Sequence, residues 1–403
     1  MRLLIAGGGT GGHIYPALAV ARSLLASADA PEVDWVGGHR GLESSLGHAA
    51  GLPLRRLALR SLRTVDLSVN TLLDPARLAL SVPQATAMLL RRRPDAIFTT
   101  GGYVAIPLLL AAAPLRIPTI LWEGNVIPGR SVRAVARLAG TIAVSFAATC
   151  RVLGGNCRVT GTPIRDIRDV DRGQARARFD LAPGDRMLLI FGGSQAVRRF
   201  NAAVSDALAR LIARVHVVHV TGEAGYRGAL SDRERLPSAV RERYRPYPFL
   251  RDDMLAALAA ADLVVGRAGS STLAEATALG LPMVVVPYPH AAGHQRANAR
   301  VLVEAGGARL VEDEAFDADA LIAAAEILAD PTRHARMAEA SRELGRPGAA
   351  DAVAELVLAA ATHRPAPDPA RLERLSRGLL RTAAAVEHAD ASEAHEPHRG
   401  GDA

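Results

Sequence analysis

The sequence predicts an α/β protein made of two Rossmann-like domains whose parallel sheets face each other across a cleft. Short apolar runs alternate along the chain with stretches of helical periodicity, which is typical of parallel sheets covered on both faces. The same opening of strand, glycine turn and helix occurs in both halves, as LLIAGGGTGG and as LLIFGGSQAV. In addition, 403 residues that are 49% hydrophobic suffice to fill two cores.

The expected strands are short apolar runs, and helices are expected between them. The runs lie at residues 3–6, 33–36, 96–99, 119–122, 141–144, 187–191, 215–220, 263–265 and 283–286. The first helix is expected to open at Pro16, because proline is favoured in the first turn of a helix. It would carry Leu18, Ala21 and Leu25.

The segment GTPIR at residues 161–165 combines a flexible glycine with a proline, so we place the domain boundary there. The first domain then covers residues 1–164 and the second residues 165–347. Residues 348–361 are apolar enough to form a helix that packs back on the first domain. Residues 362–403 are rich in proline and charge and are expected to be mostly disordered, with 372–385 as a candidate short amphipathic helix.

Composition excludes several functions. The chain contains no lysine, so all 48 basic residues are arginine and the net charge is +7. A Schiff-base lysine and a Walker-type phosphate lysine are therefore excluded. Nucleic-acid binding is not expected, because no arginine stripe carries interleaved aromatic residues. The basic balance favours phosphate-bearing ligands and anionic lipids.

Cysteine usage and hydropathy indicate the compartment. Cys150 and Cys157 are the two cysteines, and nothing near them has metal-ligand spacing, so we expect them to be buried and reduced. The first apolar run is too short for a signal peptide, and the longest one is interrupted by Pro107 and Pro114. We expect a soluble, cytoplasmic chain that touches a membrane from one side.

The first candidate site is the glycine turn that runs from Gly7 to His13. It matches the loose dinucleotide pattern G-x-G-x-x-G, but the second strand ends in Gly37 and Gly38 rather than in the carboxylate that this ligand requires. A tight turn without a ligand is the structural alternative. His13 favours a functional site, because a titratable imidazole is an unusual choice for packing alone.

Three further constellations lie in the second half. In GGSQ, at residues 192–195, backbone amides and Ser194 are suited to a diphosphate, although Ser194 could equally cap a helix. After Gly269, hydroxyl side chains crowd a helix start, followed by Glu275, which would bind ribose hydroxyls or favour the helix dipole. A proline-rich loop then leads to His294 and Gln295 at the expected carboxyl edge of the sheet.

Together these motifs resemble the MurG family of peptidoglycan N-acetylglucosaminyltransferases, which convert lipid I to lipid II. The resemblance covers roughly residues 1–361. It rests on GGTGGH at 8–13, GGSQ at 192–195, the segment 269–275 and the pair His294-Gln295; GGYVAIP at 101–107, WEGNVIPG at 122–129 and GTPIR at 161–165 also match. Two positions depart from the family: Gly124 replaces a longer side chain, and Ala196 replaces a glycine.

The resemblance implies a GT-B fold and an inverting, metal-independent enzyme without a cofactor. It would move N-acetylglucosamine from UDP-GlcNAc to the C4 hydroxyl of undecaprenyl-diphospho-MurNAc-pentapeptide. His13 is the implied catalytic base, assisted by Glu123, and the alternative for His13 is a structural role in shaping the loop. The implied substrate-binding residues are Thr10, Gly11, Gly12, Asn125, Arg165, Ser194, Gln195, Leu250 (or Arg251), Ser270, Ser271, Thr272, Glu275, His294 and Gln295.

Three other enzyme classes remain as alternatives: a natural-product glycosyltransferase, a UDP-sugar 2-epimerase and, least favoured, a nicotinamide oxidoreductase. The Asp-x-Asp metal motif of the other common glycosyltransferase architecture has a candidate in Asp317 and Asp319, but a solvated helix cap explains this pair better.

Membrane docking is predicted from apolar residues that stand beside arginines. We expect the apolar groups to enter the lipid and the arginines to meet anionic headgroups at the cytoplasmic face. Ordinary core packing of the leucines is the alternative. The residues are Leu67, Val69, Leu72, Leu73, Leu78 and Leu80, with Arg55, Arg56, Arg60, Arg63 and Arg77.

Overall fold

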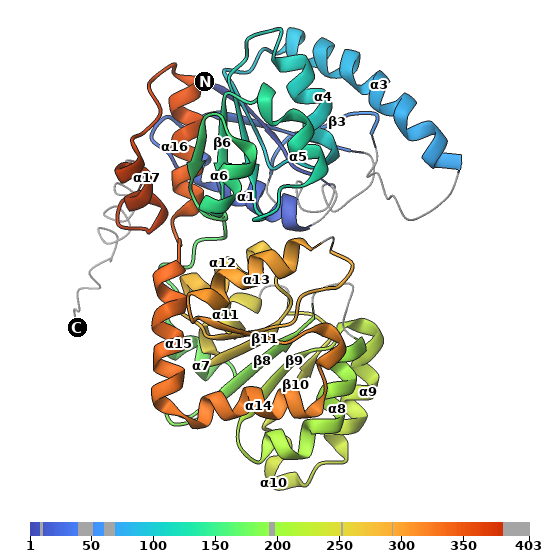
Figure 1. Ribbon diagram of the computed structural model, residues 1–403, viewed down its shortest axis with the longest axis vertical. Coiled ribbons are helices and arrows are strands. Elements are labelled where there is room, and N and C mark those ends of the chain that lie inside the picture. The colour runs from blue at the N-terminus through green and yellow to red at the C-terminus, as the bar shows by residue number, and fades with distance from the viewer. Residues whose placement is uncertain are drawn as a thin grey trace, which may run out of the picture. The chain divides into compact units, whose positions relative to one another are not determined.

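In the computed structural model the chain forms two compact units, each with its own parallel sheet (Figure 1). The structure describes residues 1–8, 11–38, 51–59, 69–192, 198–250, 253–291 and 293–381, and for residues 69–76 the backbone alone. The first unit comprises Met1–Gly124, Pro128–Arg165 and the chain from Gly348 onward; the second comprises Asn125–Ile127 and Asp166–Pro347. The expected α/β class with two parallel sheets is confirmed.

The sheet of the first unit has seven strands in the order β3-β2-β1-β4-β5-β6-β7, and every pairing is parallel. Leu3 lies opposite Val33 on one side and opposite Ala96 on the other. The strand order therefore reverses between β1 and β4, which makes their carboxyl ends the expected ligand edge. The bounds are β1 (Arg2–Ala6), β2 (Glu32–Gly37), β3 (Leu54–Arg56), β4 (Ala96–Thr99), β5 (Thr119–Glu123), β6 (Thr141–Val144) and β7 (Cys157–Val159).

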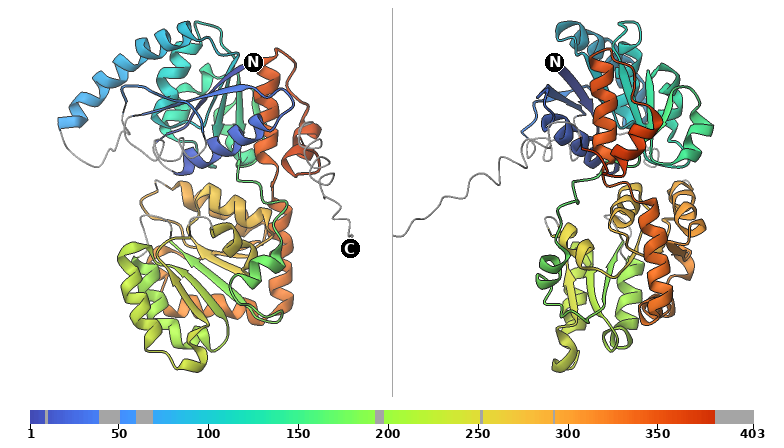
Figure 2. Two further views of the ribbon diagram at one scale, coloured as in Figure 1. Left: turned by 180° about the vertical axis from the view of Figure 1, so that it is seen from behind. Right: turned by 90° about the vertical axis from the view of Figure 1, so that its left-hand side faces the viewer.

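Helices cover both faces of this sheet, and each face has its own core. One core joins β1 and β2 to α1 (Gly11–Leu25), α16 (Ala349–Ala361) and α17 (Pro369–Ser376), with Trp35 fully buried. The other contains residues of α3 (Val69–Arg91), α4 (Gly102–Ala112) and α5 (Arg130–Val135). The 3-10 helix η1 (Ala136–Leu138) and α6 (Ala147–Leu153) complete the unit. Figure 2 shows α16 and α17 beside the strands that precede them by hundreds of residues in sequence.

The sheet of the second unit has six parallel strands in the order β10-β9-β8-β11-β12-β13. Its order reverses between β8 and β11, so the carboxyl ends of these two strands are the expected ligand edge of this sheet, as those of β1 and β4 are in the first unit. The bounds are β8 (Met187–Phe191), β9 (His216–Val220), β10 (Tyr244–Tyr247), β11 (Leu263–Gly266), β12 (Met283–Val285) and β13 (Ala308–Leu310).

Two cores also sandwich this second sheet. One contains residues of α8 (Arg198–Ile212), α9 (Gly222–Glu234), α14 (Ala318–Ala329) and α15 (Pro331–Leu344). The other contains residues of α7 (Arg172–Ala177), α11 (Met254–Ala260), α12 (Ser270–Ala278) and α13 (His294–Glu304). The short helices α10 (Ser238–Arg241) and η2 (Asp313–Ala315) lie in connections. Asp317 caps α14, since its Oδ1 accepts a hydrogen bond from the Ala320 amide at 2.9 Å, as the solvated-cap interpretation predicts.

Two expectations were wrong. Helix α1 begins at Gly11 rather than at Pro16, which lies buried inside it, so His13 stands in the first turn. Cys150 and Cys157 are half-buried and disulfide-bonded rather than reduced, because α6 and the start of β7 bring their Cα atoms to 5.6 Å. The candidate short helix of the tail, expected at 372–385, is α17 at Pro369–Ser376, where Leu372 and Leu375 are buried against the first core.

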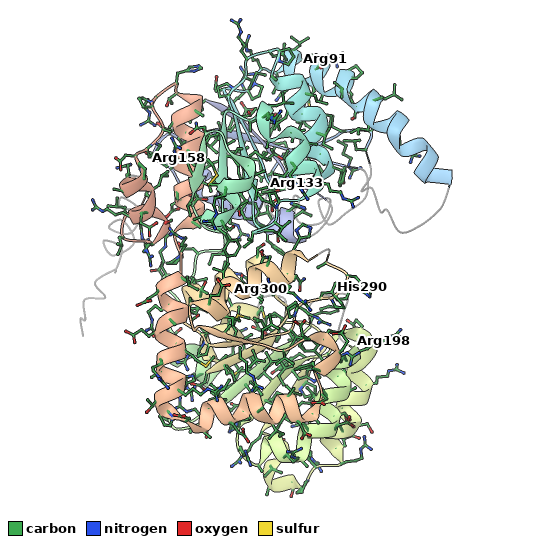
Figure 3. All side chains as sticks on the ribbon, in the orientation of Figure 1. Arg91, Arg133, Arg158, Arg198, His290 and Arg300 are labelled. Atoms are coloured by element: carbon green, nitrogen blue, oxygen red, sulfur yellow. A yellow bond between two sulfur atoms is a disulfide. The ribbon has the colours of Figure 1, made fainter. Side chains whose placement is uncertain are left out.

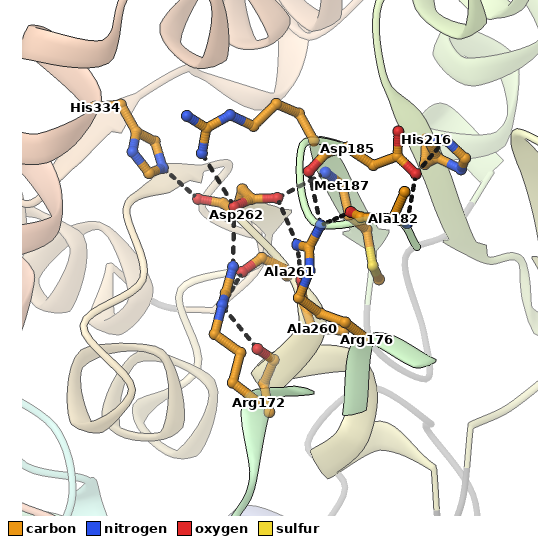
Figure 4. Close-up of polar contacts among 12 residues, drawn as sticks. Arg172, Arg176, Ala182, Asp185, Met187, His216, Ala260, Ala261, Asp262 and His334 are labelled. Atoms are coloured by element: carbon orange, nitrogen blue, oxygen red, sulfur yellow. Dashed lines mark hydrogen bonds and ion pairs between the residues drawn. The ribbon is translucent and has the colours of Figure 1, made fainter. Parts of the chain in front are cut away.

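A network of arginines around Asp262 lies at the amino edge of the second sheet, opposite the ligand edge (Figure 4). The buried Asp262 carboxylate accepts hydrogen bonds from Arg172 Nη2 at 2.9 Å and from the Met187 amide at 2.8 Å. Arg172 Nη1 also donates to the carbonyls of Ala259 and Ala261 at 2.7 and 2.9 Å. These contacts satisfy carbonyls at the end of α11, and burial lowers the pKa of Arg172. We assign the network a structural role.

The buried His219 of β9 makes stability depend on pH. Burial lowers its pKa to about 3, whereas the unfolded chain binds the same proton near pH 6.5. The contribution of His219 to the free energy of unfolding is therefore fully present above about pH 6.5. It falls as the pH drops toward 3, by at most about 1.4 kcal/mol per pH unit. We expect His219→Gln to flatten the decline of the urea midpoint between pH 7 and pH 5; equal slopes in both proteins would contradict this assignment.

Candidate functional site

His13 stands at the ligand edge of the first unit. Its Nδ1 lies 2.7 Å from the carbonyl oxygen of Thr100, and the Thr100 hydroxyl donates to the His13 carbonyl at 2.9 Å. Because a carbonyl only accepts, Nδ1 carries the proton, and Nε2 of the neutral ring is left as a lone-pair acceptor. No hydrogen bond to Nε2 occurs within the described part of the chain. A neutral imidazole held in this tautomer is suited to take up a proton.

A glycine pair packs against this imidazole. Gly101 and Gly102 precede and open α4 with φ values of +82° and +70°. A Cβ on Gly101 would lie 2.7 Å from Val132 Cγ2, and one on Gly102 would lie 3.6 Å from His13 Cδ2 and 3.8 Å from Nε2. Glycine is therefore required here both by conformation and by space, and it keeps the surroundings of Nε2 open.

Glu123 ends β5 and is 4% exposed. Its Oε2 accepts a hydrogen bond from the Gly129 amide at 2.8 Å, and Gly129 is the N-cap of α5. The carboxylate thus holds the turn that contains Gly124 and leads into α5. This geometry gives Glu123 a positioning role for the turn.

At the ligand edge of the second unit, α12 presents its amino end. Gly269 is the N-cap in extended conformation, and the three hydroxyl residues Ser270, Ser271 and Thr272 form the first turn, half-buried. Ser271 Oγ is buried and has no hydrogen-bond partner among the described residues. Unpaired amides and hydroxyls at a helix start favour an anion. Glu275 lies on the next turn and is half-buried.

The start of α13 carries the other amide and imidazole groups. Gly293 is its N-cap with φ +79°. His294 Nδ1 donates to the Ile127 carbonyl at 2.8 Å, and Gln295 Oε1 accepts from the Tyr288 amide at 2.9 Å. Asn125, also in the second unit, is bound through its Oδ1 to Asn298 Nδ2 at 3.0 Å.

Asn298 is fully buried, and its Oδ1 also accepts from the Val126 amide at 3.0 Å. Asn298 lies one turn after the pair His294-Gln295 on α13, and no role was predicted for it from the sequence. Thr100 was missed as a part of the site, and its only signal is that it directly follows β4. Arg267 opens the hydroxyl-rich motif that the sequence singled out, but it was given no role of its own. Two exposed residues of the second unit are Arg198, at the first position of α8, and His290, in the loop before α13 (Figure 3).

Several predicted site residues lie elsewhere in the structure than the sequence suggested, and others lie outside the residues that the structure describes. Leu250 is 5% exposed and its side chain belongs to a core, so only its backbone is available to a ligand. Arg165 is half-buried and closes the first unit rather than opening the second. Gly11 and Gly12 form the first turn of α1. The residues outside the described ranges are Thr10, Ser194, Gln195, Ala196 and Arg251.

The chain matches two family models. Residues 3–144 match the glycosyltransferase family 28 N-terminal domain, and residues 187–355 match the glycosyltransferase family 28 C-terminal domain. A relative from Desulforamulus reducens is 37% identical over 362 residues, which cover 87% of this chain and 96% of the relative. It is named UDP-N-acetylglucosamine--N-acetylmuramyl-(pentapeptide) pyrophosphoryl-undecaprenol N-acetylglucosamine transferase.

Solved structures agree with this assignment. The crystal structure of Acinetobacter baumannii MurG is similar with a TM-score of 0.73 and 27% identity, covering 89% of this chain and 99% of that one. The UDP-GlcNAc 2-epimerase of Neisseria meningitidis shares the fold alone. Its TM-score is 0.61 at 16% identity, and the match covers 89% of this chain and 100% of that one. The resemblance drawn from the four motifs is confirmed, and the chain belongs to glycosyltransferase family 28.

Proposed function

We propose that this protein transfers N-acetylglucosamine from UDP-GlcNAc to the C4 hydroxyl of undecaprenyl-diphospho-MurNAc-pentapeptide, the step from lipid I to lipid II in peptidoglycan synthesis. The observation that carries the proposal is the 37% identity to an enzyme of that name over nearly its whole length. The ligand edges of both units add chemistry suited to the reaction: a lone pair on His13 and an open helix start at α12.

The base step is assigned to His13 Nε2. The acceptor C4 oxygen attacks C1 of the donor sugar on the face opposite the diphosphate, and its proton passes to Nε2. The bond between C1 and the diphosphate oxygen breaks, so that UDP leaves and the anomeric configuration is inverted. Glu123 supports this step indirectly, by holding the turn before α5 through the Gly129 amide.

The donor is assigned mainly to the second unit. The amino end of α12, with Ser270, Ser271 and Thr272, stabilises the negative charge that develops on the departing diphosphate. Ser194 and Gln195, which lie between β8 and α8 in sequence, are proposed for the same diphosphate. Glu275 is proposed for the ribose and Gln295 for the sugar. Arg165 and the backbone of Leu250 are proposed for the nucleoside.

A transfer assay tests the proposal. The full chain is incubated with radiolabelled UDP-GlcNAc and a soluble lipid I analogue, and both UDP and the labelled disaccharide product are measured. We expect UDP and product to form in equal amounts, and only when the acceptor is present. Release of UDP without product, or formation of an epimerised UDP-sugar, would overturn the proposal.

We further propose that the protein docks peripherally on the cytoplasmic membrane face, with α3 as the contact. No helix in the described part of the chain is long and apolar enough to cross a membrane. Leu80 and Leu90 of α3 are 66% and 64% exposed, which favours lipid contact for these two leucines. Leu78 of the predicted patch packs against the core instead. Arg60, Arg63 and Leu67 of the predicted patch lie outside the described residues, and the side chains of Val69, Leu72 and Leu73 are not described.

We expect Leu80→Gln combined with Leu90→Gln to reduce sedimentation with vesicles that contain anionic lipid by about tenfold, because two large apolar groups no longer enter the lipid. Leu379→Gln, at a leucine that is 70% exposed and lies outside α3, is the control and should bind like the parent. Binding that is equal for neutral and anionic vesicles would contradict the electrostatic part, and unchanged binding of the double variant would contradict the role of α3.

A further inference from the structure

We infer that the buried ion pair between Arg267 and Asp313 sets the donor-sugar specificity, by holding the loop that orients the Gln295 amide. The inference rests on the proposed function for the identity of the donor. It concerns the residues behind the sugar site, which would act as positioning residues without touching the ligand.

The ion pair between Arg267 and Asp313 is short and shielded from solvent. Arg267 directly follows β11, and Asp313 opens η2. Arg267 Nη1 and Asp313 Oδ1 are 2.6 Å apart, and the two side chains are only 9% and 14% exposed. The other carboxylate oxygen, Oδ2, contacts Arg199 Nε at 3.2 Å. A short, shielded pair of this kind holds the guanidinium in one orientation.

Arg267 transmits that orientation to the loop between β12 and α13. Its Nη1 also donates to the carbonyl oxygens of Val286 and Pro287, at 3.1 and 3.3 Å. Its guanidinium carbon lies 5.5 Å from the centre of the Tyr288 ring and 4.9 Å from that of Phe200. Three consecutive residues of the loop, Val286 to Tyr288, are therefore held by one side chain.

The loop in turn orients Gln295. The Tyr288 amide donates to Gln295 Oε1 at 2.9 Å, so the oxygen end of this carboxamide is fixed toward the protein. Its Nε2 has two N–H donors, and no hydrogen bond of Nε2 occurs among the described residues. The group presented to a sugar is thus an N–H hydrogen-bond donor that points in a fixed direction. Such a group distinguishes between the two orientations of a hydroxyl on the hexose ring.

The test compares UDP-GlcNAc with its C4 epimer UDP-GalNAc. Asp313→Asn removes the charge but keeps the shape, and the double variant Arg267→Met with Asp313→Leu replaces both partners by apolar groups, so that no buried charge remains unpaired. Asp319→Ala is the matched control, because Asp319 forms an exposed ion pair with Arg210 at 2.8 Å in the same unit. Affinities for both sugar nucleotides and for UDP are measured by calorimetry.

We expect the preference for UDP-GlcNAc over UDP-GalNAc to fall about tenfold in both test variants, as for one lost hydrogen bond. The affinity for UDP should stay near that of the parent. The double variant should also keep the melting temperature of the parent. The control should keep its preference. In a Gln295→Ala background the effect of Asp313→Asn should vanish, since both changes remove the same contact. A well-folded double variant with unchanged preference, or additive effects with Gln295→Ala, would overturn the inference.

Because these are binding measurements, they are independent of transfer. If the parent protein binds UDP-GlcNAc selectively but transfers nothing to lipid I, the proposed function fails while the inference stands. If transfer occurs and the variants discriminate like the parent, the inference fails alone.

Discussion

His13→Ala is expected to lower kcat by roughly 100- to 10,000-fold while the affinity for UDP-GlcNAc stays nearly unchanged. The reason is the tautomer: Nδ1 donates to the Thr100 carbonyl at 2.7 Å, so the ring has its basic nitrogen on the opposite side. Removing the imidazole removes the proton acceptor but no group of the proposed donor site. Single-turnover rates at saturating substrates, together with calorimetric donor binding, measure the two quantities.

His13→Asn separates catalysis from structure. The asparagine amide N–H can replace Nδ1–H in the hydrogen bond to Thr100, but it offers no base. We expect this variant to be as slow as His13→Ala, with the melting temperature of the parent. Recovery of the rate in His13→Asn, or loss of donor affinity in proportion to rate in either variant, would show that the rival role of shaping the glycine turn is the correct one.

Glu275→Ala is expected to weaken UDP-GlcNAc binding by roughly ten- to a hundredfold, equivalent to about 1.5–3 kcal/mol for one charged hydrogen-bond partner. Glu275 lies on α12 beyond the first turn of hydroxyl residues, where it is suited to accept hydrogen bonds from a ribose. The dissociation constant from calorimetry measures the effect. Glu326→Ala, at an exposed position of α14, is the control and should bind the donor normally.

A donor that lacks the ribose 2′-hydroxyl identifies the contact. The parent protein should bind it more weakly than UDP-GlcNAc, whereas Glu275→Ala should bind the two almost equally, because the partner of that hydroxyl is gone. An unchanged donor affinity in Glu275→Ala would remove Glu275 from the site and leave it only the dipole interaction at the start of α12.

The strands that the sequence predicted are those inside the two sheets, and the four that it missed are the edges. β3, β7, β10 and β13 end the sheets and read LRR, CRV, YRPY and ARL. An edge strand pairs on one side only, so it can be short and charged. Each of these four contains an arginine and therefore lacks the apolar run by which interior strands are recognised.

Within the site, local motifs identified residues but not their partners. The glycine turn pointed to His13, yet the Thr100 carbonyl that sets its tautomer comes from the residue after β4, 87 residues away. Arg267 and Asp313 are 46 residues apart, and no local spacing signals their pairing. Glu123 was expected to assist His13 at the sugars. The amide that binds its carboxylate belongs to a turn whose path only the fold defines.

The return of α16 to the first sheet has a consequence for the order in which the units mature on the ribosome. Residues 166–347 contain a whole sheet with both of its faces covered, so this unit can close as soon as it emerges. The first unit emerges earlier but lacks Val353, Leu356 and Val357 on one face of its sheet. Until α16 is synthesised, that face of the sheet lacks its apolar cover, so we expect the amino-terminal unit to be the later of the two to complete its fold.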